Sequence, residues 1–186
     1  MIGNRTNRIF IQPDNASGKL SVRTDKDTTV LTDYFSGEFE GVSKHTPKNT
    51  ENVFYRFNFR DGNENYTLSL PESGARDVIR ALLSIEKFNG VVIRIDAKGK
   101  LVQTRFGVKN MVNLYVSVNG QWVKWAIPAP EGNNTDAWFE QNMALLNSRC
   151  SNLTGGEPQA TVQPHDVGDG DDMPPAGDDE NFFNEQ

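Results

Sequence analysis

The chain has 186 residues and a formal net charge of −6, and this charge is unevenly divided. From Glu157 onward there are nine acidic residues and no lysine or arginine, so 16 of the 25 acids share residues 1–156 with all 19 cations. The body therefore carries about +3 and the tail −9, which permits a polyanionic partner for the body. A single cysteine, Cys150, excludes an internal disulfide.

No run of apolar residues is long enough to span a bilayer, and the N-terminus lacks the apolar stretch of a signal peptide. We therefore expect a soluble cytoplasmic protein, located in the host cytoplasm if the source is viral.

Alternating side chains predict strands in the first half of the body. Residues 28–31 lead into a long strand at 34–42, whose glycines allow a bend or bulge. Residues 53–60 alternate with period two, so Tyr55, Phe57 and Phe59 share one face, which we expect to be buried because the other face carries two arginines. The Asp61-Gly62 turn then leads into a strand at 66–70.

The second half begins with a change of period. Apolar residues at helical spacing predict an amphipathic helix over about 73–87, and a second helix is predicted from Thr135 to about Ser148. Further strands are predicted between these helices: one from Val91, one after a turn at Lys98-Gly99-Lys100, and a hairpin of 112–118 and 121–127 around Asn119-Gly120.

The segment from residue 154 to 186 is rich in glycine, proline and aspartate and has almost no aliphatic residues. Such a composition cannot bury enough apolar surface to offset the entropy of ordering. We therefore divide the chain into a folded domain at 1–153 and a disordered acidic C-terminal tail at 154–186.

Five strands with a helix between the third and the fourth follow the element order of the OB-fold, a five-stranded Greek-key β-barrel. Together with the acidic tail and its terminal aromatics, this order resembles the single-stranded DNA-binding proteins of bacteriophage replication systems. The resemblance implies a mainly β OB-fold with an extra C-terminal helix. It also implies sequence-independent single-stranded DNA binding in replication, recombination or repair, and a tail that recruits partner proteins.

Single-strand binding requires cations for phosphates and flat side chains on which bases stack. Candidate stacking residues are Tyr34, Phe54, Tyr115 and Trp122, and candidate phosphate contacts are Lys44, Lys48, Arg56, Arg60, Arg105, Lys109 and Lys124. Ordinary solvated charges and aromatics packed beneath the second helix are the competing interpretation of these residues.

The tail holds the candidate partner-binding residues Asp178, Asp179, Glu180, Phe182 and Phe183. In bacterial members of the family an aromatic usually lies within the last two residues, whereas here Asn184-Glu185-Gln186 follow. Nine tethered negative charges would compete with DNA for a cationic groove at an effective concentration of about millimolar. A simple solubilising tail is the alternative, although two phenylalanines do not serve solubility.

The sequence gives little support for catalysis. Its only histidines are His45 and His165, and it contains no cysteine–histidine metal cluster, no phosphate-binding loop and no nucleophile elbow. We expect no cofactor, no metal and no enzymatic activity. A protein-interaction β-module, such as a viral adaptor or inhibitor, and a structural virion component remain as alternatives, and the oligomeric state, including self-association, stays open.

Overall fold

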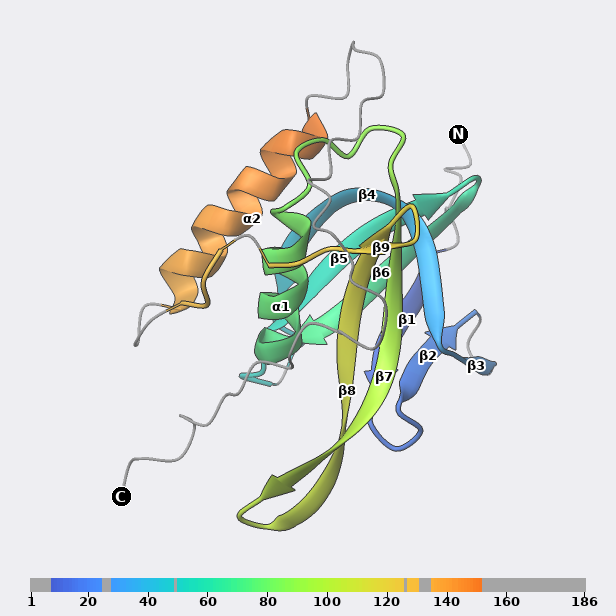
Figure 1. Ribbon diagram of the computed structural model, residues 1–186, viewed down its shortest axis with the longest axis vertical. Coiled ribbons are helices and arrows are strands. Elements are labelled where there is room, and N and C mark those ends of the chain that lie inside the picture. The colour runs from blue at the N-terminus through green and yellow to red at the C-terminus, as the bar shows by residue number, and fades with distance from the viewer. Residues whose placement is uncertain (1–7, 25–27, 49, 126, 131–134, 152–186) are drawn as a thin grey trace.

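The computed structural model describes residues 8–24, 28–48, 50–125, 127–130 and 135–151 (Figure 1). Within these residues the chain forms one nine-stranded mixed sheet and two helices, α1 (Glu72–Leu82) and α2 (Thr135–Ser151). The strands, in chain order, are β1 (Arg8–Asp14), β2 (Lys19–Arg23), β3 (Thr29–Thr32), β4 (Tyr34–His45), β5 (Phe54–Asp61), β6 (Glu64–Pro71), β7 (Val92–Thr104), β8 (Gly107–Val118) and β9 (Gln121–Trp122). The mainly β class is therefore confirmed.

The strand order is β3-β2-β1-β6-β5-β4-β7-β8-β9, so the described strands form one nine-stranded sheet and not a closed barrel of the five predicted strands. The sheet is extended instead of closed because the edge of β6 pairs in parallel with β1. In the centre, β4 pairs antiparallel with both β5 and β7, while β5 pairs with β6 and β7 with β8. The first helix lies between β6 and β7 along the chain, as predicted.

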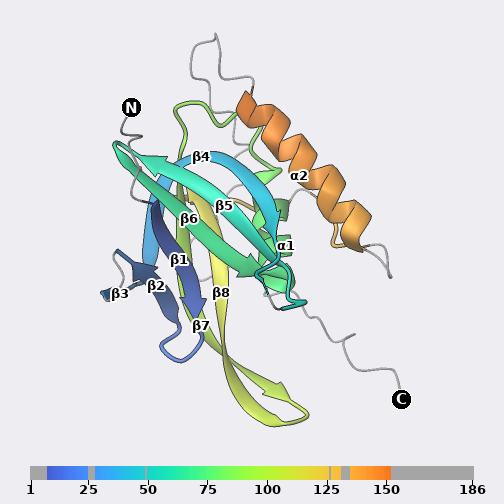
Figure 2. The same cartoon turned by 180° about the vertical axis from the view of Figure 1, so that it is seen from behind.

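The two N-terminal strands were not predicted, although Ile9 and Ile11 alternate with outward-facing side chains along β1. Figure 2 shows β1 beside β6 on the back of the molecule, with β2 on the far side of β1. The turn that joins β1 to β2 touches the β7–β8 hairpin, where Asn15 accepts a hydrogen bond of 3.0 Å from the Val112 amide. The curled sheet is thus bridged by the β1–β2 hairpin.

The predicted turn at Lys98-Gly99-Lys100 is also wrong, because β7 runs through these residues to Thr104. Gly99 serves packing: an added Cβ atom would lie 3.1 Å from the Cα atom of Gly18. The actual turn lies at Arg105-Phe106, and β8 begins at the next residue, Gly107.

The core lies on the inner face of the sheet, beneath α1. Tyr55, Phe57 and Phe59 are buried there, as the alternation along β5 predicted. The rings of Phe35 and Phe59 meet edge to face at 5.1 Å. Helix α1 closes the core with apolar residues at helical spacing, namely Ala75, Val78, Ile79, Ala81 and Leu82.

The second helix packs against β4 and α1. A β-bulge after Phe39 leaves Gly41 with φ of +148°, and Asn147 of α2 bonds both the amide (2.8 Å) and the carbonyl (2.9 Å) of Val42. The ring of Phe139 stacks on that of Tyr55 at 4.2 Å. These contacts attach α2 to the inner face of the sheet.

Both helices have bounds that differ from the predicted ones. Helix α1 begins at Glu72, after Pro71, and ends at Leu82 instead of continuing to residue 87. The amides of Ser84 and Ile85 bond the carbonyls of Ala81 and Leu82, so a tighter turn replaces the last helical turn. Helix α2 extends three residues beyond the predicted end at Ser148.

Candidate nucleic-acid interface

Three aromatic side chains lie on the outer face of β4, β7, β8 and β9. Tyr34 lies opposite Asp96, which lies opposite Tyr115, in one row across three strands. The neighbouring row joins Arg94 of β7 through Ser117 to Trp122 of β9. Directly opposite residues share a face of a sheet. We call this set (Tyr34, Arg94, Asp96, Tyr115 and Trp122) the aromatic patch.

Charged contacts hold the aromatic patch in place. The guanidinium carbon of Arg94 lies 3.8 Å from the ring centroid of Tyr34, and its Nη2 donates to Asp96 at 2.6 Å. The hydrogen bond to Asp96 raises the pKa of Arg94. Tyr115 and Trp122 contact each other edge to face, with ring centroids 5.6 Å apart. Tyr34 remains 46 % exposed although Arg94 covers part of its ring.

The outer half of the β7–β8 hairpin, residues 98–113, extends away from the body (Figure 1). We call this segment the hairpin arm. Lys98 and Lys100 follow Asp96 at period two along β7, so both continue the outer face that carries the aromatic patch. Lys109 lies opposite Val102 on that same face of the arm. The arm therefore extends the patch with a line of cations.

At its tip the arm presents Phe106, which is 74 % exposed. The guanidinium carbon of Arg105 lies 4.7 Å from the ring centroid of Phe106, and the ammonium of Lys109 lies 5.7 Å from it. Thr104 fixes the turn, because its hydroxyl donates to the Gly107 carbonyl at 2.7 Å and accepts from the Phe106 amide at 3.2 Å. A flat ring between two cations suits a nucleotide, with a base to stack and a phosphate to neutralise.

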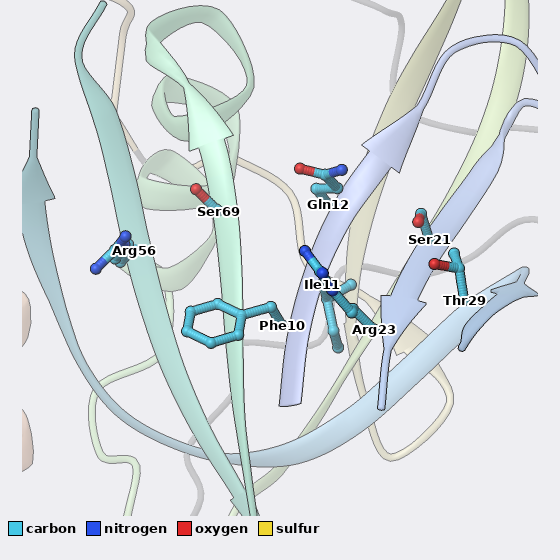
Figure 3. Close-up of a pocket in the computed structure, with 8 residues that line it drawn as sticks. All are labelled: Phe10, Ile11, Gln12, Ser21, Arg23, Thr29, Arg56 and Ser69. Carbon is cyan, nitrogen blue, oxygen red and sulfur yellow. The ribbon is translucent and has the colours of Figure 1, made fainter. Parts of the chain in front are cut away.

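A second cluster lies on the outer face of β1, β2, β5 and β6, with Thr29 of β3 at its side, where there is an open pocket of about 410 Å³. Figure 3 shows the side chains that line it, which are Phe10, Ile11, Gln12, Ser21, Arg23, Thr29, Arg56 and Ser69. Arg56 comes from the predicted set. Its Nε atom is buried without a hydrogen-bond partner, and its guanidinium carbon lies 6.0 Å from the Phe10 ring centroid.

The other predicted residues are scattered. Arg60 pairs with Glu38 (3.1 Å) and Glu40 (3.4 Å), and Lys44 pairs with Asp136 of α2 at 3.0 Å. Phe54 is half-buried at the start of β5. Lys48 and Lys124 are exposed, on the β4–β5 connection and after β9. The structure thus brings together Tyr34 with Tyr115 and Trp122, and Arg105 with Lys109. The tail residues, from Asp178 to Phe183, and the boundary at 153/154 lie outside the described residues.

The predicted set omitted Arg94, Phe106, Phe10 and Arg23. The alternation along its strand predicts that Arg94 points outward. Its position beside Tyr34 depends on the pairing of β4 with β7, in which Arg94 lies opposite Ser36. Phe106 was missed because the turn was predicted at Lys98-Gly99-Lys100 and not at Arg105-Phe106. Phe10 and Arg23 are cross-strand partners in the β1–β2 hairpin, where the alternation of Ile9 and Ile11 was the available signal.

No family model, curated protein or solved structure matches this chain. In the part of the chain that the structure describes, no cluster of three or more histidine, cysteine, aspartate or glutamate residues is arranged to hold a metal ion. None of the described helices has the length and apolarity that crossing a membrane requires.

Proposed function

We propose that this protein binds single-stranded DNA without sequence preference, using the aromatic patch and the hairpin arm. The observation that carries the proposal is the pair of cross-strand rows that puts Tyr34, Tyr115 and Trp122 on one face with a line of lysines beyond them. Every base has a π-face, so stacking on such rings is worth roughly 1–3 kcal/mol per base whatever the sequence. The protein is proposed to be a binding protein and not an enzyme.

The pairing of the central strands supports an OB-type core. The unit β4–β5–β6–α1–β7–β8 has the OB element order, and its first strand pairs with both the second and the fourth. In this proposal β1 and β2 are additions to an OB-type core, placed along the edge of its third strand. The long connection between the fourth and fifth OB strands then corresponds to the hairpin arm, next to the face that OB-folds use for oligonucleotides.

Each group in the interface has a distinct part in binding. Tyr115 and Trp122 offer ring faces to bases, and Tyr34 is held by Arg94 in a fixed orientation, which lowers the entropy lost on binding. Lys98, Lys100 and Lys109 neutralise phosphates and release counterions, so affinity falls as salt rises. Arg105 and Phe106 at the tip form a further contact for the strand.

The acidic tail is proposed to compete with DNA for these cations and to recruit replication, recombination or repair proteins when DNA displaces it. Its nine carboxylates and the Phe182-Phe183 pair are the sequence features that support this role. A phage replication system is the biological setting that the resemblance favours, with action in the host cytoplasm.

The test is a titration of the full chain with oligo-dT, followed through tryptophan fluorescence at low and high salt. We expect quenching of the tryptophan emission, reduced in Trp122→Phe, together with binding that weakens with salt and much weaker binding to duplex DNA of the same length. Absence of binding at low salt, both for the full chain and for the chain truncated after residue 156, would overturn the proposal.

A protein-interaction module is the second candidate, because the hairpin arm also exposes apolar side chains. Leu101 is 69 % exposed and Val108 is 61 % exposed, and both lie on the face of the arm opposite the lysines. Oligo-dT binding that is weak and insensitive to salt, together with specific binding of a protein through Leu101 and Val108, would favour this candidate.

A further inference from the structure

The pocket on β1, β2, β5 and β6 is separate from the proposed strand interface. Three strands, β6, β5 and β4, lie between β1 and β7 in the sheet. On β4 and β5, the carboxylates of Glu38 and Glu40 and their partner Arg60 stand between the two regions. The pocket is therefore a second candidate site, distinct from the aromatic patch.

The lining of this pocket has the composition of an anion site beside a flat surface. Arg23 and Phe10 are direct cross-strand partners, and Figure 3 shows the Phe10 ring between the side chains of Arg23 and Arg56. The ring is 43 % exposed although it lies at the centre of the site. Hydroxyl and amide groups surround these three residues, supplied by Gln12, Ser21, Thr29 and Ser69.

Arg56 has an unmet hydrogen-bonding requirement at this position. Its Nε atom is buried and has no partner within the described residues. A buried donor without an acceptor costs about 1–3 kcal/mol, and more when the group is charged. Two oxygens of a phosphate accept parallel hydrogen bonds from one guanidinium group, so a phosphate that reaches Nε in the pocket would satisfy Arg56.

We propose that this pocket binds one nucleotide, with the phosphate held by Arg56 and Arg23 and the base stacked on Phe10. The volume of about 410 Å³ is within the range of small-molecule sites and accommodates a single nucleotide. Ser21, Ser69 and Gln12 are placed around the ring to bond the sugar and the base edge. The nucleotide is either free or one residue of a bound strand, since both present the same phosphate, sugar and base.

The proposal is tested by isothermal titration calorimetry of the full chain with thymidine 5′-monophosphate, thymidine and inorganic phosphate. Saturable binding of the monophosphate, about tenfold or more tighter than that of either fragment, is expected because the site contacts both ends of the ligand. No saturable binding of the monophosphate up to about 5 mM would overturn the proposal.

The matched variants are Arg56→Gln, Arg56→Lys and Phe10→Ala, with Arg60→Gln as the control. Arg60 lies on the same strand and face as Arg56, but it pairs with Glu38 and Glu40 and does not line the pocket. We expect a loss of about tenfold or more in monophosphate affinity for the first three variants and none for the control. Unchanged affinity in Arg56→Gln and Phe10→Ala, at unchanged melting temperatures, would contradict the assignment.

Two further measurements identify the source of the nucleotide and separate this proposal from the preceding one. If oligo-dT displaces the monophosphate, the pocket holds a nucleotide of the strand; if both bind independently, it holds a free nucleotide. Because the chain also contains Trp125 and Trp138, the quenching that disappears in Trp122→Phe is the signal that reports the aromatic patch alone. If oligo-dT causes this quenching but the monophosphate does not bind, the pocket proposal is refuted. If the monophosphate binds but oligo-dT causes no such quenching, the strand interface is refuted.

Discussion

Gly18 and Gly99 meet backbone to backbone where the β1–β2 turn touches the middle of β7. A Cβ atom on Gly18 would lie 2.9 Å from the Cα atom of Gly99, closer than real Cβ contacts allow. Gly18 also has φ of +72°, in the left-handed region that favours glycine. These two glycines permit the N-terminal hairpin to close onto the central strands.

Replacing Gly18 by alanine should destabilise the protein. The control is Gly62→Ala, because Gly62 has φ of +55° but nothing within 4 Å of an added Cβ. Both variants incur about 1–2 kcal/mol of backbone strain, and Gly18→Ala should cost about 1–3 kcal/mol more from overpacking. Urea unfolding measures the difference in the free energy of unfolding. Equal losses in the two variants would show that the contact is unimportant.

Tyr115→Ala should weaken oligo-dT binding by about 1–3 kcal/mol, because a base loses its stacking surface. Tyr115→Phe should bind nearly as the wild type does, since the ring is retained. Fluorescence anisotropy of a labelled oligonucleotide gives both affinities. Wild-type affinity in Tyr115→Ala, with its fold intact by circular dichroism, would remove Tyr115 from the interface.

The double substitution Lys98→Gln and Lys100→Gln should reduce the salt dependence of binding. Each lost phosphate contact lowers the slope of log affinity against log salt by about 0.7 on single strands, so the pair should lower it by about 1.4. Lys44→Gln is the comparison, because Lys44 pairs with Asp136 beside α2 and should leave the slope unchanged. Equal slopes in all three proteins would mean that the arm contacts no phosphate.

Removal of residues 157–186 should strengthen oligo-dT binding, most of all at low salt, because nine competing negative charges are lost. The gain should decrease as salt screens the attraction between tail and body. Titrations of the full and truncated chains at several salt concentrations provide the comparison. The same affinity and slope for both chains would refute competition by the tail.

Burial in α2 raises the pKa of the Cys150 thiol from 9.0 to about 11. The folded state therefore holds this proton more tightly than the unfolded state does. The resulting stability is complete below about pH 9 and is lost as pH rises through about 11. Between about pH 8 and pH 10.5, wild-type protein should lose more unfolding free energy than Cys150→Ala does.

A thiol reagent at about pH 8 gives an independent measurement, with slow reaction in the native protein and fast reaction in urea. Fast reaction of the native protein, or an identical pH dependence in Cys150→Ala, would contradict the burial of this side chain.

Local patterns in the sequence were sufficient for part of the central unit of the fold. Period-two alternation identified the buried face of β5, and the change to helical period placed α1 between the correct strands. Barrel closure could not be judged from the sequence because it depends on which strand occupies the edge of β6, and a parallel partner 57 residues away leaves no local signal. Gly99 was misread because glycine indicates a turn and a close backbone approach equally well.

The candidate site was predicted only in part, because its arrangement also depends on which strands pair. The stacking residues Tyr34, Tyr115 and Trp122 were selected for their side-chain chemistry, and strand pairing brings them together. Charge pairing could not be predicted from chemistry alone. Arg60 and Lys44 look identical in the sequence to other basic residues, yet partners on β4 and α2 neutralise them.

The hairpin arm has fewer buried side chains than the rest of the sheet. From Lys98 to Leu114 no described side chain is buried, whereas Ile93 and Ile95 on the same strand are inaccessible to solvent. Its ladder of backbone hydrogen bonds therefore has little apolar burial behind it, and local opening should require far less free energy than global unfolding. Amide hydrogens of the arm should exchange quickly while those of the inner half of β7 remain protected. A ligand that lies along the arm would slow this exchange without any change in the core.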